Sequence, residues 1–281
     1  MASDKEWSES FAKASTGAMS FYDDVMVPRL FDPWAYLLLD TLNPKSGQDV
    51  IDVACGPGTV TRLAARRVGP SGHVTGCDLS PAMLELARSK APLDASAPIV
   101  YLQCPADALD VPDDAFDLVT CQQGLQFFPD RSRALGEMQR VLRPGGKLGI
   151  SVWCDIEECP PFLALAVALE EVLGAEVADT YRGGPWGFGD AAALEQLAKD
   201  AGFVDVHVHK HELPVVFEDG PGQLLLTLQA AAVAPTLAQL SEADQLSLAR
   251  AVEYASRHIT VDGVVRSHAA SHILTATARD G

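Results

Sequence analysis

The stretch that most constrains the fold is residues 50–61, VIDVACGPGTVT, where strand-forming residues give way to glycines and then to a helical pattern. The apolar, β-branched residues before the glycines suit a buried parallel strand. Gly56 and Gly58 allow a sharp backbone bend and a close approach by a ligand, and Thr59 can open a helix. The sequence therefore predicts a strand, a ligand-binding turn and a helix in succession.

An acidic residue follows this turn at a spacing typical of nucleotide-binding α/β proteins. Asp78 comes twenty residues after Gly58 and directly after a second apolar run, residues 73–77. A carboxylate at the end of a second strand can accept hydrogen bonds from a ribose diol. The G-x-G-x-x-G dinucleotide fingerprint is incomplete, because Ala54 and Thr59 occupy two of its glycine positions. The pattern indicates an adenosine-containing cofactor and disfavours a nicotinamide dinucleotide.

Three further segments follow in a fixed order: ADA at residues 106–108, FDLVTCQQGLQFF at residues 116–128 and RVLRPGGKLGISVW at residues 140–153. With the glycine turn and Asp78 they resemble the motifs of class I S-adenosylmethionine-dependent methyltransferases, in particular the type 11 branch of small-molecule enzymes. The resemblance covers residues 40–153. It implies S-adenosyl-L-methionine as the cofactor and S-adenosyl-L-homocysteine as the product.

The order of predicted elements indicates the fold class. From residue 50 the chain alternates strand and helix, as in a doubly wound parallel sheet. The resemblance implies an α/β, Rossmann-like, seven-stranded mixed sheet of order 3-2-1-4-5-7-6, with the last strand antiparallel and with helical cap insertions. Strands after the second are expected over residues 99–102, 116–121, 147–153, 203–211 and 272–278, and later helices over residues 131–142, 161–174, 190–201 and 242–258. Ser80 and Ser241 are expected to cap helices, residues 144–146 to stop one, and Gly174 to end another in a left-handed conformation. The helix over 161–174 is apolar on all sides in its first half and is expected to be buried, and Leu246, Ala249 and Val252 are expected on the apolar face of the helix over 242–258.

The same reasoning predicts four parts of the chain. Residues 1–44 form an N-terminal helical segment that covers the cofactor site, and residues 45–218 form the methyltransferase core with a helical insertion near 156–180. Residues 219–258 form a helical cap insertion, and residues 259–281 hold the final strand of the core. Residues 220–241 carry no charge, and Pro235 with several glutamines and threonines favours a cap helix broken at Pro235 over a membrane span.

The resemblance also implies roles for individual residues. The backbone from Ala54 to Gly58 faces the methionine part of the cofactor, Asp78 holds the ribose, and Asp107 meets the adenine amino group. Gln122 and Gln123 face the methionine end and the substrate. The full set of expected cofactor-binding residues is Tyr22, Asp52, Ala54, Gly56, Gly58, Asp78, Leu79, Met83, Ala106, Asp107, Ala108, Gln122 and Gln123.

The expected reaction is in-line methyl transfer to O, N or C of a small, apolar or aromatic molecule. No catalytic residue is assigned, because an activated methyl donor needs mainly alignment and exclusion of water. Gln126 stands where many family members have His, which argues against a His base in that loop. His258, His268, His272 and Tyr181 are other candidates for a general base, each with a structural role as the simpler explanation. A nicotinamide-dependent oxidoreductase and a cofactor-binding protein without methyl transfer are the alternatives.

Composition restricts the partners. Asp plus Glu total 38 against 21 Lys plus Arg, a net charge of −17, so phosphate backbones are repelled and a nucleic-acid substrate is not expected. The first residues, MASDKEWSES, lack the basic and apolar regions of a secretory signal, which favours cytoplasmic residence. The predicted partner is a small-molecule methyl acceptor, and a homodimer is left open.

Neither the cysteines nor the histidines predict a metal site. The six cysteines lack C-x-x-C spacing and are expected as reduced, buried thiols. Five of them fall at or just past the ends of the first five predicted strands, the edge where ligands bind, which leaves a cysteine-lined cleft open: Cys55, Cys77, Cys104, Cys121 and Cys154. His207, His209 and His211 share one strand face with Asp205. That face indicates an exposed edge strand rather than a zinc or nickel site.

Overall fold

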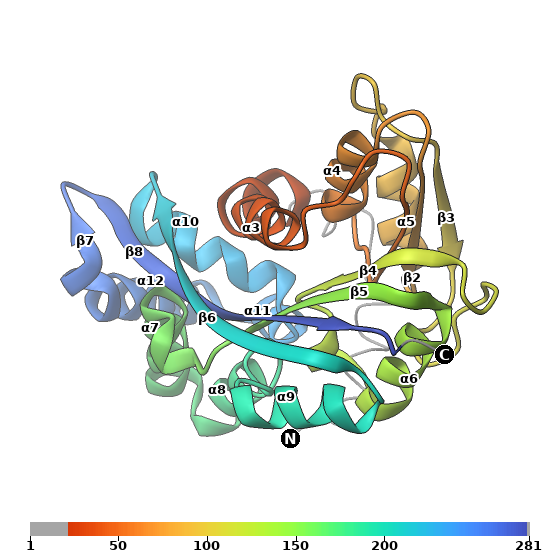
Figure 1. Cartoon of the computed structure of the whole chain (residues 1–281). Helices are drawn as coiled ribbons and strands as arrows, with labels where there is room; N and C mark the ends of the chain where they lie inside the picture. The colour runs from red at the N-terminus through yellow and green to blue at the C-terminus, as the bar shows by residue number, and fades with distance from the viewer. Residues whose placement is uncertain (1–21, 280–281) are drawn as a thin grey trace.

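The computed structural model describes residues 22–279. A mixed sheet has α3 (Asp32–Leu42) and α4 (Thr59–Val68) on one side and α6 (Arg131–Val141) and α9 (Ala191–Asp200) on the other (Figure 1). The strands stand in the order β3-β2-β1-β4-β5-β8-β6, and β7 pairs with β8. Their bounds are β1 Asp49–Val53, β2 His73–Asp78, β3 Ile99–Gln103, β4 Phe116–Gln122, β5 Leu142–Trp153, β6 Val204–Phe217, β7 Thr260–Val261 and β8 Val264–Thr277.

The predicted sheet order is confirmed, since the strand expected last is β8 and lies antiparallel between β5 and β6. The first five strands pair in parallel. The sheet also contains a strand that was not predicted, the two-residue β7, which pairs antiparallel with the start of β8. The part of the predicted N-terminal segment before Tyr22 lies outside the described residues.

The α- and π-helices are η1 Tyr22–Phe31, α3 Asp32–Leu42, α4 Thr59–Val68, α5 Pro81–Ser89, α6 Arg131–Val141, α7 Pro160–Leu173, α8 Ala175–Arg182, α9 Ala191–Asp200, α10 Gly220–Leu226, α11 Ala234–Leu237 and α12 Glu242–Ser256. Short 3-10 turns are η2 Leu125–Phe127, η3 Ile156–Glu158, η4 Thr227–Ala230 and η5 Arg257–Ile259. The helix η1 is a π-helix with Pro28 inside it. The predicted caps are confirmed, because Ser80 accepts the Met83 N–H at the start of α5 and Ser241 accepts the Asp244 N–H at the start of α12.

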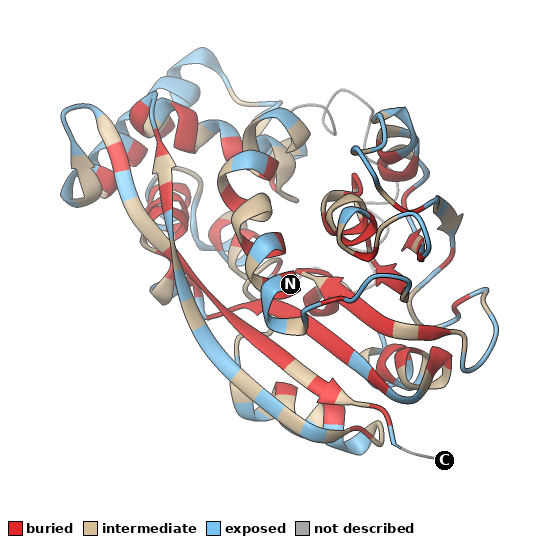
Figure 2. Ribbon diagram, turned by 45° about the horizontal axis from the view of Figure 1, so that its top comes forward, coloured by how far each residue is buried: buried red, intermediate tan, exposed pale blue. Residues whose placement is uncertain are grey.

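Buried side chains form three clusters. One lies against α6 and α9 and includes Leu135, Met138 and Leu194; another lies against α3 and α4 and includes Leu39, Val60 and Ala64; the third joins α3, α7, α10 and α12 and includes Trp34, Leu165, Leu224 and Val252. Figure 2 shows buried residues along the central strands and an edge strand with alternating exposure. That edge strand is β6, as the histidine pattern predicted.

Several predicted boundaries were wrong. The chain enters β5 at Leu142, so residues 144–146 lie inside that strand as an irregularity, and regular pairing with β4 resumes at Lys147. Pro235 does not break a helix: it lies in the first turn of α11, a position that needs no backbone N–H, and the interruption comes before it. Gly174 has φ 89° but ψ 168°, so it ends α7 without the expected left-handed helical cap.

Two further expectations need correction. The edge strand β6 and its neighbour β8 each run for 14 residues, longer than predicted, because they pair with one another from Val204 to Phe217. In α12 the buried positions are Leu248, Ala251, Val252 and Ser256, whereas Leu246, expected on the apolar face, is exposed. Within residues 22–279, no helix is both long and apolar enough to cross a bilayer.

Candidate functional site

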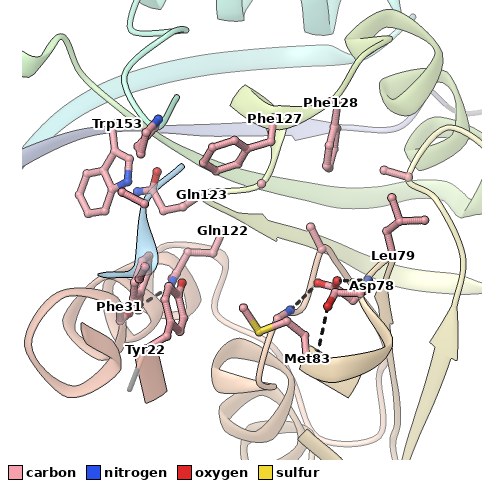
Figure 3. A pocket seen from close by; sticks show the side chains of 18 of the residues that line it. Tyr22, Phe31, Asp78, Leu79, Met83, Gln122, Gln123, Phe127, Phe128 and Trp153 are labelled. Carbon is pink, nitrogen blue, oxygen red and sulfur yellow. Dashed lines mark hydrogen bonds between the residues drawn. The ribbon is translucent and has the colours of Figure 1, made fainter. Parts of the chain in front are cut away.

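A cavity of about 290 Å³ lies at the carboxyl ends of the central strands (Figure 3). It extends from the ends of β2 and β3, past the glycine turn and the loop after β4, to the end of β5, where α7, α8 and η4 complete its wall. Ten of the expected cofactor-binding residues line it: Tyr22, Ala54, Gly56, Asp78, Leu79, Met83, Ala106, Asp107, Gln122 and Gln123. Their contact with a cofactor remains a prediction.

The other three expected residues do not line this cavity. Ala108 is exposed, one residue beyond Asp107. Gly58 has φ 81°, and a Cβ there would lie 2.6 Å from the Tyr101 hydroxyl, so glycine is needed for packing behind the turn. Asp52 lines a smaller neighbouring cavity of about 40 Å³. Gly58 and Asp52 therefore pack behind the glycine turn and stabilise the part of the cavity wall that it forms.

Asp52 joins three elements. Its carboxylate accepts hydrogen bonds from the hydroxyls of Thr61 on α4, at 2.6 Å, and Thr120 on β4, at 2.8 Å. Burial raises the pKa of Asp52 to about 6, although the two hydroxyls oppose this rise by stabilising the charged form. Asp52 thus fixes the glycine turn between β1, β4 and α4.

The alanine that replaces the first glycine of the motif has a left-handed backbone. Ala54 has φ 58°, a region that alanine rarely adopts. Its methyl group is accommodated by Gly124 in the loop after β4, where an added Cβ would come within 2.7 Å of the Ala54 Cβ. The two positions are sterically coupled, so Gly124 allows alanine to stand in the turn.

The carboxylate of Asp78 is held by backbone N–H groups on both sides. Oδ2 accepts from Gly56 at 2.8 Å, and Oδ1 accepts from Ser80 at 2.8 Å. Burial raises the pKa of Asp78, and the N–H groups of Ser80, Gly56 and Leu79 oppose that rise. Each carboxylate oxygen can accept a second hydrogen bond, and Figure 3 shows Asp78 between the glycine turn and α5 on the cavity wall. The carboxylate can therefore bind a diol as well as hold the turn.

An amide network follows β4. Gln122 donates to the Phe31 carbonyl at 3.0 Å, and its buried Oε1 has no partner within residues 22–279. Gln123, with φ 52°, donates to the Ser271 hydroxyl at 3.0 Å and accepts from Gln126 at 3.3 Å. Gln126 does not line the cavity but orients Gln123, and the free Oε1 of Gln122 can accept a hydrogen bond from a ligand.

The π-helix η1 covers one side of the cavity. Tyr22, Met26, Leu30 and Phe31 line it, and the rings of Tyr22 and Phe31 lie 4.9 Å apart. Burial and the nearby charges of Asp78 and Asp23 raise the pKa of Tyr22, so its hydroxyl stays protonated. Asp23 forms an ion pair with Lys90 at the end of α5, at 2.5 Å with both side chains largely buried. This ion pair ties η1 to the core.

The far wall was not predicted from the sequence. It contains Trp153, Phe162, Tyr181, Trp186 and Thr227. The helix α7 was expected to be buried because its first half is apolar on all sides, and the structure confirms this by packing α7 against α8 and α12. That all-round apolar pattern and the aromatic residues near 181–186 were the available signals for an aromatic wall.

Of the candidate general bases, only Tyr181 lines the cavity among the described residues. His258 is exposed, and His268 faces its strand partner Pro214 in the β6–β8 pair. His272 is buried, with its Nε2 2.9 Å from the Gly189 carbonyl. No group of three or more His, Cys, Asp or Glu side chains in the described part of the chain is arranged to hold a metal ion.

The cysteines are free and buried. Cys104 lines the large cavity and Cys55 the small one, while Cys77, Cys121, Cys154 and Cys159 line neither. The cleft is thus lined by aromatic and apolar side chains rather than by cysteines. The thiols act mainly as small apolar side chains, five of them at strand ends and Cys159 before α7.

Comparisons with known proteins agree with this geometry. The model of the ubiE/COQ5 methyltransferase family matches residues 9–218. A demethylmenaquinone methyltransferase of Lactococcus lactis is 36% identical over 194 residues, 64% of this chain and 75% of the relative. A ubiquinone/menaquinone biosynthesis C-methyltransferase, UbiE, of Hahella chejuensis is 38% identical over 142 residues, 49% of this chain and 57% of the relative.

A solved structure extends the likeness of fold beyond the matched motifs. Phosphoethanolamine N-methyltransferase 2 of Haemonchus contortus, in complex with phosphomonomethylethanolamine and S-adenosylhomocysteine, aligns with a TM-score of 0.60 over 99% of this chain and 61% of that chain. At 20% identity this alignment shows a shared fold only. The family match covers the glycine turn, Asp78 and every other motif noted in the sequence. The chain therefore belongs to the ubiE/COQ5 methyltransferase family, and it is an S-adenosylmethionine-dependent methyltransferase.

Proposed function

We propose that this methyltransferase acts on a small, neutral aromatic acceptor of the quinone-precursor type. The observation that carries the proposal is one continuous cavity with two different walls. At one end stand Asp78 and Asp107, and at the other stand Trp153, Phe162 and Trp186. The names of two relatives, which refer to ubiquinone and menaquinone, support this acceptor class. Which acceptor atom receives the methyl group, O, N or C, depends on the identity of the acceptor.

The residues present fit the cofactor. Asp78 offers two oxygens to a ribose diol, Asp107 is a half-buried acceptor at the end of β3, and the unpartnered Oε1 of Gln122 can accept from an amino group. We propose these as the contacts of the cofactor's ribose, adenine and methionine parts. Ala54 and Gly56 bring the backbone close, while Leu79 and Met83 supply apolar contact beside them.

The chemistry needs little from the protein beyond binding. When bound, S-adenosylmethionine supplies an activated methyl group and leaves as a neutral thioether, and the proton of the acceptor goes to bulk solvent before the acceptor enters or after the product leaves. Tyr22 and Phe31 on η1 cover the cavity and exclude water. The aromatic wall holds the acceptor in line with the methyl group, and such alignment can supply roughly 7–11 kcal/mol of the barrier reduction. A dedicated base is therefore not required by the geometry.

We propose that residues 219–258 act as a substrate cap on a core of residues 45–218 and 259–281, with residues 1–44 as the cover of the cofactor end. Thr227, Ala230 and Ala231 reach the cavity from the cap near its aromatic wall, and this placement supports the assignment. The apolar contacts of α12 with α7 also place this segment in the structural core. Point substitutions at Thr227 or Ala230 therefore test the cap more cleanly than deletion.

The net charge of −17 supports a small-molecule rather than a nucleic-acid substrate, and six free cysteines support residence in a reducing compartment such as the cytoplasm. Light scattering tests whether the chain forms a homodimer.

Calorimetry with S-adenosylmethionine, S-adenosylhomocysteine and NAD tests the cofactor assignment. The first two should bind and NAD should not. Preferential NAD binding would contradict the proposal and favour an oxidoreductase. Mass spectrometry after incubation with a library of quinones, quinols and phenols then identifies the acceptor.

A further inference from the structure

The acceptor end of the cavity is shaped as an aromatic slot. The ring of Tyr181 on α8 lies 5.2 Å from that of Trp186, and Phe162 on α7 lies 5.3 Å from Trp186. All three line the cavity with Trp153 at the end of β5. Flat rings stack favourably on such surfaces, so the slot suits a planar ring but does not by itself say which substituents that ring carries.

Two side chains of the slot, Tyr181 and Trp186, have a donor without a hydrogen-bond partner within the described residues; the Nε1 of Trp186 is fully buried, whereas the Tyr181 hydroxyl reaches the cavity. Thr227 donates its hydroxyl proton to the Leu224 carbonyl at 2.7 Å, and Gln123 is engaged with Ser271 and Gln126. By contrast, the Tyr181 hydroxyl has no hydrogen-bond partner within the described residues and remains open to the cavity that Tyr181 lines, although the side chain is only 3% exposed. A ligand that fills the slot displaces water from this hydroxyl, and leaving the hydroxyl unpaired would be costly. A ligand atom that accepts its proton avoids that cost.

The protonation and charge of the side chains around the slot limit which ligand atom can bind there. Burial raises the pKa of Tyr181 well above its ordinary value, so this tyrosine is a proton donor in a hydrogen bond and not the general base considered from the sequence. None of the cavity-lining residues in the described part of the chain is Lys, Arg or His. An acceptor held by a carboxylate or phosphate would therefore lack a counter-charge here. The complementary ligand atom is a neutral or weakly anionic oxygen on an aromatic ring.

Building on the proposed function, we propose that Tyr181 is a specificity-determining residue that donates a hydrogen bond to a ring oxygen of the acceptor. The acceptor class is thereby narrowed to quinols and phenols, whose electron-rich rings and oxygens can attack the methyl group, with aromatic hydrocarbons and ring carboxylates excluded. When a phenol or quinol has lost its proton, the same hydroxyl stabilises the charge on the oxygen. Tyr181 contacts the acceptor directly but takes no proton from it.

The test measures binding of two matched probes to the protein saturated with S-adenosylhomocysteine. The probes are 2,3-dimethyl-1,4-naphthoquinone, whose substituted ring does not trap thiols, and 2,3-dimethylnaphthalene, which lacks the oxygens. The ratio of their dissociation constants is measured for the wild type, for Tyr181→Phe and for Tyr36→Phe, a control at an exposed tyrosine on α3. The ratio removes differences in packing that affect both probes equally.

We expect Tyr181→Phe to lower the preference for the quinone by about three- to tenfold, the usual loss for one neutral hydrogen bond, while Tyr36→Phe leaves it unchanged. An unchanged ratio, or equal weakening of both probes, would overturn the inference. Should Tyr181→Phe fail to fold, Tyr181→Met is measured in its place with the same criterion. Binding of S-adenosylhomocysteine is titrated first and tests the proposed function separately. If the wild type does not bind S-adenosylhomocysteine, the proposed function is contradicted. If it binds but the ratio of probe dissociation constants is the same in Tyr181→Phe, only the role of Tyr181 is contradicted.

Discussion

The backbone N–H of Gly56 donates to Oδ2 of Asp78 at 2.8 Å, which ties the glycine turn after β1 to the end of β2. The other oxygen of Asp78 accepts from Ser80 at the start of α5. The Asp78 carboxylate thus holds two parts of the cavity wall, the glycine turn and the start of α5, and also faces the cavity. Its structural role and its expected role in binding ribose can be separated by experiment.

Asp78→Ala should weaken binding of S-adenosylhomocysteine by roughly 10- to 100-fold, because one or two charge-assisted hydrogen bonds are worth about 1.5–3 kcal/mol. Isothermal titration calorimetry measures the change. An analogue with a 2′,3′-dideoxyribose separates the two roles, since wild type and variant should bind it equally if Asp78 holds the diol. An unchanged dissociation constant for S-adenosylhomocysteine in a folded variant would remove Asp78 from the site.

Asp107→Asn should cost less than Asp78→Ala. Asp107 lines the cavity and is half-buried, and an amide oxygen can still accept a hydrogen bond from an adenine amino group without the full charge. We expect a loss of about 1 kcal/mol, or roughly fivefold in affinity. If the wild type bound the cofactor equally well with adenine and with hypoxanthine, which lacks the amino group, Asp107 would not accept a hydrogen bond from that amino group.

Asp52 should make stability depend on pH. Its pKa is about 6 in the folded protein against an ordinary 3.8, so between these values the folded state binds a proton more tightly than the unfolded chain. Its contribution is therefore unfavourable above pH 6 and is relieved as the pH falls. The stability of the wild type relative to Asp52→Asn should rise by about 2 kcal/mol from pH 7 to pH 4.5. Urea unfolding at both pH values checks this, and a difference that shrinks on acidification would contradict it.

The ion pair between Asp23 and Lys90 should slow release of the cofactor. It joins η1 to α5 and is largely shielded from solvent, so Lys90→Met should raise the dissociation rate of S-adenosylhomocysteine by roughly fivefold, equivalent to about 1 kcal/mol. Stopped-flow measurements compare it with Lys45→Met, a change at an exposed lysine. The double variant Asp23→Lys with Lys90→Asp should restore a slow rate. Equal rates in the wild type and Lys90→Met would show that η1 is held by packing alone.

The features that could be predicted from the sequence are those determined by residues close together in the chain. The turn at residues 54–58, the Ser80 cap of α5 and the Ser241 cap of α12 each depend on a few neighbouring residues, and all appear in the structure. The sheet order followed from the motif order, because the family resemblance carries its topology. Ten of the expected site residues reach one cavity for the same reason.

Features that depend on distant pairing could not be predicted in this way. The lengths of β6 and β8 are set by their mutual register, and Pro214 within β6 reads as a strand end in the sequence although edge strands tolerate proline. The aromatic wall is assembled from β5, α7, α8 and η4, and no local sequence pattern predicts that these elements lie close together in space. Asp52 was expected at the cofactor, since the sequence shows its position near the end of the first strand but not the Thr61 and Thr120 hydroxyls that hold it.

The most direct test of the account is transfer of a labelled methyl group. The protein is incubated with methyl-deuterated S-adenosylmethionine and a prenylated 1,4-dihydroxynaphthalene under reducing conditions, with Asp78→Ala as the matched control. We predict equal amounts of S-adenosylhomocysteine and of quinol carrying the intact labelled methyl group, and a much lower yield with the control. If the folded wild type binds S-adenosylmethionine but transfers no label to this acceptor or to any quinone, quinol or phenol supplied, the proposed acceptor class is contradicted.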